Sequence, residues 1–226
     1  MTASGDVVVA IDGPAGAGKS TVAREVASRA GLRYLDTGAT YRAMTLALLR
    51  GGVDLDDPAE ISRAAKDVDL EVRPDPADPA VELVRLDGRE PGAALRSEAV
   101  NAAVSAVSAV PAVRALLVAL QRAAIGDGGI VVEGRDVGTV VWPEAQVKVF
   151  LTADVAERAR RRGADEGGSA GAALAERDRK DSGRAVAPTM AHPDATVIDS
   201  TGMRFPEVVD AVLAMVEAAR PRGVPR

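Results

Sequence analysis

Residues 7–21 read VVVAIDGPAGAGKST, and this stretch decides the fold. Its first five residues are apolar and mostly β-branched, which predicts a short strand buried on both faces. The residues that follow match the pattern G-x-x-x-x-G-K-[ST], with Gly13, Lys19 and Ser20 among its fixed positions. A strand, such a loop and the start of a helix together form a cradle for phosphate groups. The stretch therefore predicts a binding site for a nucleoside triphosphate.

The loop contains the residue types that phosphate binding needs. Glycines let successive backbone N–H groups point at one anion, Lys19 adds a compact positive charge, and the Ser20 hydroxyl can bind Mg²⁺. A glycine-rich turn without a ligand is the alternative, and a dinucleotide-binding turn is disfavoured because Thr21 stands where its third glycine would be. The ATP-binding residues predicted in the loop are Gly13, Pro14, Ala15, Gly16, Ala17, Gly18, Lys19, Ser20 and Thr21.

The composition excludes several classes of protein. The chain has 226 residues, 47% of them hydrophobic, which suffices for one domain with a substantial core. A formal net charge of −5 argues against a nucleic-acid-binding protein, and the lack of cysteine excludes disulfides and thiolate metal sites. We find neither a signal peptide nor an uninterrupted apolar run that could cross a membrane. We therefore expect a cytoplasmic monomer with no nucleic-acid or membrane partner.

Four more short apolar runs alternate with helical patterns along the chain. They lie at residues 32–35, 130–133, 147–151 and 196–199. With the first run they predict an α/β fold of the P-loop NTPase type, a doubly wound sheet of five parallel strands. Ligands bind outside the carboxyl ends of such strands, so we expect Asp36-Thr37 and the loop after the third strand to share one cleft with the phosphate loop. The helix after the phosphate loop is predicted to turn Arg24 toward solvent.

The region from residue 54 to residue 109 interrupts this alternation. Strand patterns at 70–73 and 81–86 flank a proline-rich loop, and Asp87-Gly88 is a two-residue hairpin signal. We therefore predict a small antiparallel subdomain inserted on the substrate side of the fold. A flexible surface excursion is the alternative.

A second insertion is predicted nearer the C-terminus. A helix that begins near Asp154 carries several arginines, residues 163–171 are glycine-rich, and another helix follows. The glycine-rich stretch is predicted to be mobile. The single domain then divides into a core (about 1–53, 110–156 and 185–226), the insert (about 54–109) and this arginine-rich helical segment (about 157–184).

Three further stretches, together with the phosphate loop, resemble the signatures of bacterial cytidylate kinases. They read LDTGATYR at residues 35–42, GRDVGTVV at 134–141 and RAVAP at 184–188. The resemblance runs in order from about Val7 to Val216, and the three stretches together are much more specific than the loop alone. It implies transfer of the γ-phosphoryl group of ATP to CMP or dCMP with Mg²⁺, and it implies that the insert is a nucleoside-monophosphate-binding subdomain. It also implies that the segment of about 157–184 is a helical lid that closes over the phosphates.

The residues fit this chemistry independently. A monophosphate oxygen is already anionic near neutral pH, so the reaction needs alignment and charge stabilisation rather than a catalytic base. Arginine grips phosphate oxygens with two N–H groups at once, and Arg42 and Arg135 come just after strand ends. Arg177, Asp181 and Arg184 are spaced to share one helix face, for which an ordinary surface ion pair is the alternative.

The resemblance assigns roles to individual residues. The CMP-binding residues that it implies are Thr37, Tyr41, Arg42, Ser105, Arg114, Arg135, Asp136, Arg177, Asp181 and Arg184. Among them Arg114 and Asp136 would read the cytosine edge; a solvated helix position and a loop cap are the respective alternatives. The catalytic residues implied are Lys19, Arg135 and Arg184, Arg158 and Arg161 join the ATP site, and Ser20 binds Mg²⁺.

Several alternatives stay open at this level. Glu133 could organise the water ligands of Mg²⁺, or it could support Arg135. A kinase that acts on UMP or AMP shares the chemistry, and a non-enzymatic nucleotide-binding regulator is the rival from another class. The second arginine cluster argues against a regulator, because one nucleotide would not require it. A GTPase is excluded, since the single asparagine, Asn101, is not part of an N-K-x-D motif.

Overall fold

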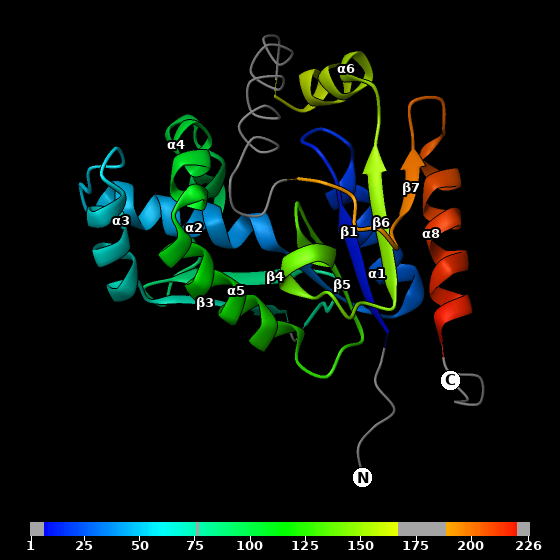
Figure 1. The fold of residues 1–226 in the computed structure, drawn as a ribbon, viewed down its shortest axis with the longest axis horizontal. Helices are drawn as coiled ribbons and strands as arrows, with labels where there is room; N and C mark the ends of the chain where they lie inside the picture. The colour runs from blue at the N-terminus through cyan, green and yellow to red at the C-terminus, as the bar shows by residue number, and fades with distance from the viewer. Residues whose placement is uncertain (1–6, 76, 167–188, 221–226) are drawn as a thin grey trace.

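The computed structural model describes residues 7–75, 77–166 and 189–220. Five parallel strands form its main sheet in the order β2-β5-β1-β6-β7 (Figure 1). Their bounds are β1 Val8–Asp12, β2 Arg33–Asp36, β5 Ile130–Gly134, β6 Val147–Thr152 and β7 Thr196–Asp199. The predicted five-stranded parallel sheet is therefore confirmed, with each strand within one residue of its expected position.

Helices cover both faces of this sheet. On one face, α1 (Lys19–Ala30) and α8 (Phe205–Ala219) pack side by side against Val9 and Ile11 of β1. On the other face, Val8 and Ala10 pack against α2 (Thr37–Arg50) and α5 (Pro111–Ile125). A strand covered on both sides needs apolar side chains at every position, which explains the uninterrupted run in β1.

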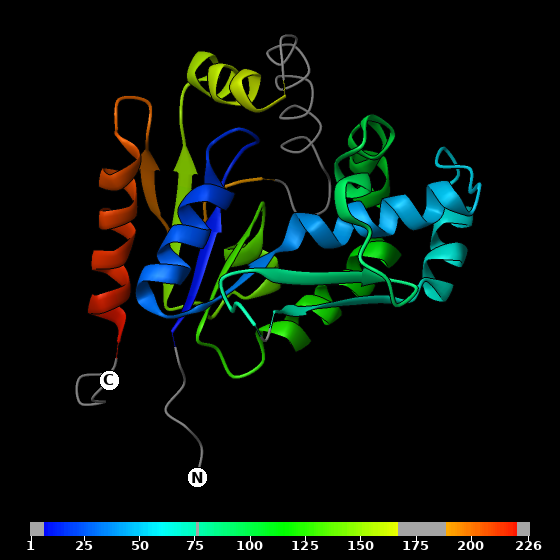
Figure 2. The same ribbon diagram turned by 180° about the vertical axis from the view of Figure 1, so that it is seen from behind.

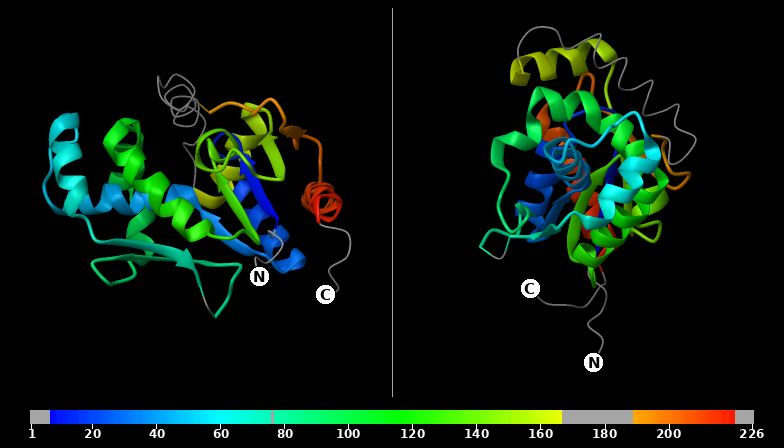
Figure 3. Two further views of the ribbon diagram at one scale, coloured as in Figure 1. Left: turned by 60° about the horizontal axis from the view of Figure 1, so that its bottom comes forward. Right: turned by 90° about the vertical axis from the view of Figure 1, so that its left-hand side faces the viewer.

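The inserted region forms the predicted antiparallel pair. β3 (Leu70–Pro74) and β4 (Glu82–Leu86) pair in the register Val72↔Val84, and both valines join the core cluster beneath the main sheet. Figures 2 and 3 show the pair reaching from beside β2 along the underside of α2. The loop between the strands returns to the core, where the backbone N–H of Tyr34 donates to the Pro79 carbonyl at 2.8 Å. The pair is thus a packed subdomain and not a flexible excursion.

The Asp87-Gly88 turn does not connect β3 to β4, although a two-residue hairpin signal predicts a turn between two paired strands. Both residues have positive φ, 51° and 71°, as a two-residue turn requires. The turn pairs Leu86 with Arg89 in an isolated bridge and so closes the end of β4 on itself. The β3-β4 connection is the longer proline-containing loop before it.

The remaining helices build the outer wall of the insert. They are α3 (Pro58–Ala64), α4 (Glu98–Ala109) and two short 3₁₀ turns, Ala65–Asp67 and Gly92–Arg96. Among the described residues no single helix is long and apolar enough to cross a membrane. Helices α4 and α5 have the necessary length and hydropathy only when they are counted together, and the chain bends by 98° between them.

Two segments near the cleft complete the described fold. The loop after β5 contains a π-helical turn, Val137–Val141, which the sequence patterns did not predict. Helix α6 (Val155–Glu166) begins after Asp154, whose Oδ1 accepts the Glu157 N–H at 2.6 Å as a cap. The second lid helix that we predicted lies outside the described residues.

Candidate active site

A cleft of about 1140 Å³ opens at the carboxyl ends of β1, β2 and β5. The phosphate loop forms one end of it, and α2, α4 and α5 form the other. The predicted site residues that line it are Ala15, Gly16, Ala17, Gly18, Lys19, Ser20, Thr21, Thr37, Tyr41, Arg42, Ser105, Arg114, Arg135, Asp136 and Arg161. The convergence expected from strand ends is therefore confirmed for the described residues.

The phosphate loop has the tight curvature that its glycines predict. Gly13 has a φ of 149°, and a Cβ on it would lie 2.0 Å from the Leu151 carbonyl oxygen. No side chain fits there, so this position needs glycine. The Lys19 ammonium donates to the Pro14 carbonyl at 3.0 Å and so folds back over the loop. Burial, and then the charge of Arg135, lower the pKa of Lys19 to about 8.

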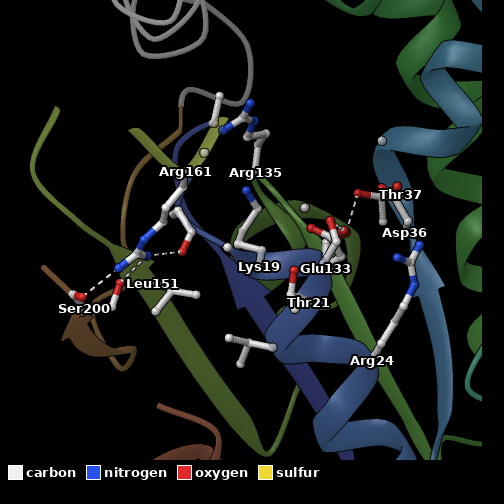
Figure 4. Close-up of a pocket in the computed structure, with 18 of the residues that line it drawn as sticks. Lys19, Thr21, Arg24, Asp36, Thr37, Glu133, Arg135, Leu151, Arg161 and Ser200 are labelled. Atoms are coloured by element: carbon white, nitrogen blue, oxygen red, sulfur yellow. Dashed lines mark hydrogen bonds between the residues drawn. The ribbon is translucent and has the colours of Figure 1, made fainter. Parts of the chain in front are cut away.

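Two arginines of α6 contact this loop in different ways. Arg158 is buried and donates to the Ala15 carbonyl at 3.0 Å, and it lies outside the set of cleft-lining residues. Arg161 lines the cleft and donates to the carbonyl of Ser200 at 2.8 Å (Figure 4). Arg158 therefore holds the loop backbone, while Arg161 lies where a nucleotide could reach it.

Glu133 stands beside the predicted metal ligand. Its Oε1 accepts the Ser20 hydroxyl at 2.5 Å and the Tyr34 hydroxyl at 3.1 Å, in a position that is 4% exposed. Burial, and then the charge of Asp36, raise the pKa of Glu133. Because Glu133 contacts Ser20, this geometry favours a role in organising the water ligands of Mg²⁺ over a role in supporting Arg135.

The acceptor end begins with an ion pair between Arg42 and Asp36. The same Asp36 side chain caps α2 by accepting the Ala39 N–H at 3.2 Å. Burial alone would raise the pKa of Asp36, but the charges of Arg42 and Arg96 hold it below its usual value. Thr37 is fixed as well, because its hydroxyl donates to the Glu133 carbonyl at 2.8 Å.

A second ion pair, between Arg114 and Asp136, lies deeper in the cleft wall. Both residues are 5% exposed, so Arg114 is not at a solvated helix position. The Asp136 side chain makes no cap hydrogen bond to the turn that follows it, so it is not the loop cap that was the alternative. The Arg114 guanidinium also lies over the ring of Tyr41, 5.6 Å from its centroid. An arginine next to a carboxylate presents N–H donors and an acceptor on one edge.

Nearly the whole chain matches one protein family. The matching family model is that of cytidylate kinase, over residues 9–218. The chain belongs to the cytidylate kinase family. It is 46% identical to the cytidylate kinase of Streptomyces griseus over 225 residues, covering 97% of this chain and 96% of the relative. It is 50% identical to that of Mycobacterium avium over 223 residues, covering 94% and 96%. Among solved structures, TT1252 from Thermus thermophilus is similar with a TM-score of 0.47 and 23% identity, covering 94% and 97%.

In this cytidylate kinase chain Arg135 lies between the two ends of the cleft. Its Nη1 donates to the Gly13 carbonyl at 2.8 Å, and Figure 4 shows its side chain and that of Lys19 pointing the same way, into the cleft. The predicted sugar and phosphate residues Arg177, Asp181 and Arg184 lie outside the described residues.

The structure adds cleft residues to this cytidylate kinase fold that the sequence reasoning missed. Arg96 lines the acceptor end, and no motif or spacing marks it. The side chain of Arg24 faces away from the core as expected and is 43% exposed, but its guanidinium also lies 5.0 Å from the ring centroid of Tyr34 and 3.7 Å from Glu82 of the insert. Helical periodicity cannot predict a neighbour that arrives from an inserted hairpin, which is why this contact was missed.

Proposed function

We propose that this chain transfers the γ-phosphoryl group of ATP to CMP or dCMP, producing ADP and CDP or dCDP, with Mg²⁺ and in the cytoplasm. The buried Arg114–Asp136 pair carries the choice of substrate, because it lies in the same cleft as the phosphate loop. Neither a UMP or AMP kinase nor a non-enzymatic regulator is favoured, given the family of the chain.

The proposed base site uses hydrogen-bond complementarity. Cytosine presents a ring nitrogen and a carbonyl as acceptors next to an amino donor. Arg114 would donate to the acceptors, and the Asp136 carboxylate would accept from the amino group, with Ser105 nearby. Uracil offers a carbonyl in place of the amino group, and a carboxylate cannot pair with it.

The proposed phosphate site brings acceptor and donor into line. Arg42, Arg135 and Arg184 would hold the acceptor phosphate together with Thr37 and Tyr41. Arg42 is already oriented by Asp36, and Arg135 by the Gly13 carbonyl, so little side-chain freedom is lost on binding. Arg177 and Asp181 would hold the sugar.

The proposed ATP site is the loop from Gly13 to Thr21, supported by Arg158 and lined by Arg161. Oxygen donors at Ser20 and Glu133 suit a hard cation such as Mg²⁺. Ser20 and Glu133 would help to hold Mg²⁺ there, and the ion would neutralise part of the charge of the nucleotide phosphates. Lys19 would stabilise the charge that develops on the moving phosphoryl group, as would Arg135 and Arg184. The division into core, insert and lid (157–184), with closure of the lid over both nucleotides, belongs to this proposal.

The test is ATP turnover, coupled to ADP detection, against a panel of nucleoside monophosphates at saturating Mg²⁺. We expect kcat/KM for CMP and dCMP to exceed that for UMP, AMP and GMP by at least about 10-fold, as one mispaired buried polar group predicts. A preference for another monophosphate would overturn the substrate assignment. Nucleotide binding without any turnover would favour the regulator.

A further inference from the structure

Asp12 is a buried carboxylate that the proposed chemistry does not use. It ends β1, directly before the phosphate loop, is 5% exposed, and is not among the residues that line the cleft. Its Oδ1 accepts the Val137 N–H at 2.7 Å, and its Oδ2 accepts the Gly138 N–H at 2.8 Å. Both carboxylate oxygens thus bind consecutive backbone amides of the loop after β5.

These two amides come directly after the residues proposed to bind CMP. Arg135 and Asp136 occupy the two preceding positions, and the Val140 N–H donates back to the Asp136 carbonyl at 2.8 Å within the π-helical turn. The neighbouring Gly13 carbonyl accepts from Arg135 at 2.8 Å. Three hydrogen bonds therefore join residues 12–13 to the segment that carries the base-reading and phosphate-binding side chains.

We propose that Asp12 is a positioning residue for the acceptor nucleotide. Its carboxylate fixes the turn from Arg135 to Gly138, and so sets where the Asp136 carboxylate meets the cytosine amino group. The inference rests on the proposed function and adds to it a residue that does not touch the substrate.

The surroundings of Asp12 shift its pKa in opposite directions. Burial raises the pKa of Asp12 to about 6, the two backbone hydrogen bonds oppose this, and the charge of Asp136 adds to it. Lys19 is the nearby cation that favours the ionised form. The stem of Lys148 on β6 packs near Gly138, while its ammonium donates to the Ala145 carbonyl at 2.9 Å. The two backbone hydrogen bonds lower the pKa because they favour the ionised carboxylate, whose two oxygens accept equally from the aligned N–H donors.

The first experiment compares Asp12→Asn with wild type. Asparagine keeps the size of the side chain but turns an N–H₂ group toward one of the two amides. We expect kcat/KM for CMP to fall by roughly 10-fold or more and the CMP/UMP ratio of kcat/KM to fall by at least about 5-fold, as loss of one buried charged hydrogen bond predicts. The matched control is Asp57→Asn, which caps α3 outside the cleft by accepting the Ala59 N–H at 2.8 Å and should leave both quantities at wild-type values.

The second experiment reads the turn directly and needs no activity. Hydrogen exchange should show that Asp12→Asn lowers the protection of the Val137 and Gly138 amides, while the amides of β5 keep theirs. In the wild type, protection of the same two amides should fall as pH decreases through about 6. If Asp12→Asn does not fold, this measurement on the wild type tests the positioning role.

An unchanged CMP/UMP ratio in a folded Asp12→Asn protein would overturn the positioning role, as would unchanged protection of both amides in the variant and at low pH. If the wild-type panel shows a preference for another monophosphate, the proposed function fails first. The exchange measurement still tests Asp12 in that case.

Discussion

Arg114 and Asp136 form an ion pair inside the wall of the cleft, and each residue is 5% exposed. Arg114 comes from α5, and Asp136 from the loop after β5. A buried pair of this kind contributes little to stability, because desolvation of both charges offsets their attraction. Both residues line the cleft that the phosphate loop also lines, a location that suits contact with a polar ligand.

Asp136→Asn tests this recognition. The amide keeps the shape of the carboxylate but can rotate to accept from cytosine or donate to uracil. We expect kcat/KM for CMP to fall by an amount that corresponds to a loss of about 1–3 kcal/mol in transition-state stabilisation. The value of kcat/KM for UMP should fall less or should rise. The matched control is Asp127→Asn on an exposed loop. A CMP/UMP ratio equal to that of wild type would show that Asp136 does not read the base.

Lys19→Ala tests the phosphate loop. Lys19 is 9% exposed, and burial lowers its pKa to about 8, so removal of the ammonium should not destabilise the fold. Turnover should fall by two or more orders of magnitude, because electrostatic stabilisation of the transition state contributes about 3–4 kcal/mol per group. Turnover and thermal unfolding are measured on the same preparation. Wild-type turnover in the folded variant would contradict the assignment of the ATP site.

Glu133→Gln tests the link between Ser20 and Mg²⁺. Loss of the charge beside Ser20 should raise the Mg²⁺ concentration that gives half-maximal turnover by roughly 10-fold, as removal of an outer-shell partner of a metal site predicts. Tyr34→Phe is the matched control, because it removes the other hydrogen bond to Glu133 and leaves the Ser20 bond in place. If the Mg²⁺ concentration that gives half-maximal turnover is the same in Glu133→Gln and Tyr34→Phe, Glu133 has only a structural role.

Glu82 on β4 predicts a pH dependence of stability. Burial, and then the charge of Asp36, raise the pKa of Glu82 from 4.5 to about 7. The folded state therefore binds more protons than the unfolded state between these values, so the free energy of unfolding should fall as pH rises from 4.5 to 7. The unfolded state prefers the ionised form, which the fold disfavours.

Glu82→Gln should remove this contribution. Above pH 7 the free energy of unfolding of the variant should exceed that of wild type by at most about 3 kcal/mol. The variant also loses the ion pair with Arg24, which makes this difference smaller. The difference should vanish near pH 4. Denaturant unfolding at several pH values measures it, and the difference between the two proteins isolates Glu82 from Asp12, whose pKa of about 6 acts in the same window. A difference that does not change with pH would refute the raised pKa.

The sequence by itself determined the sheet and the phosphate loop. Each strand is a short apolar run within one segment, and the loop pattern requires glycine, lysine and serine at fixed spacing, so both signals are local. The Asp154 cap and the start of α5 at Pro111 were predictable for the same reason. At the acceptor site, strand ends pointed to Arg42 and Arg135. Arg114 was named only through the family resemblance, because no local pattern distinguishes it from a surface arginine.

Only the tertiary structure decided the contacts between distant segments. Asp12 meets Val137 across 125 residues, and no propensity or spacing encodes that approach. Arg24 keeps its expected partial exposure, but no sequence pattern predicted that the inserted β4 brings Glu82 beside it. The hydrogen bond from Arg158 to the Ala15 carbonyl of the phosphate loop likewise joins residues 143 positions apart. Periodicity gives the direction of a side chain on its own element, whereas its partners depend on which elements the packed sheet brings next to it.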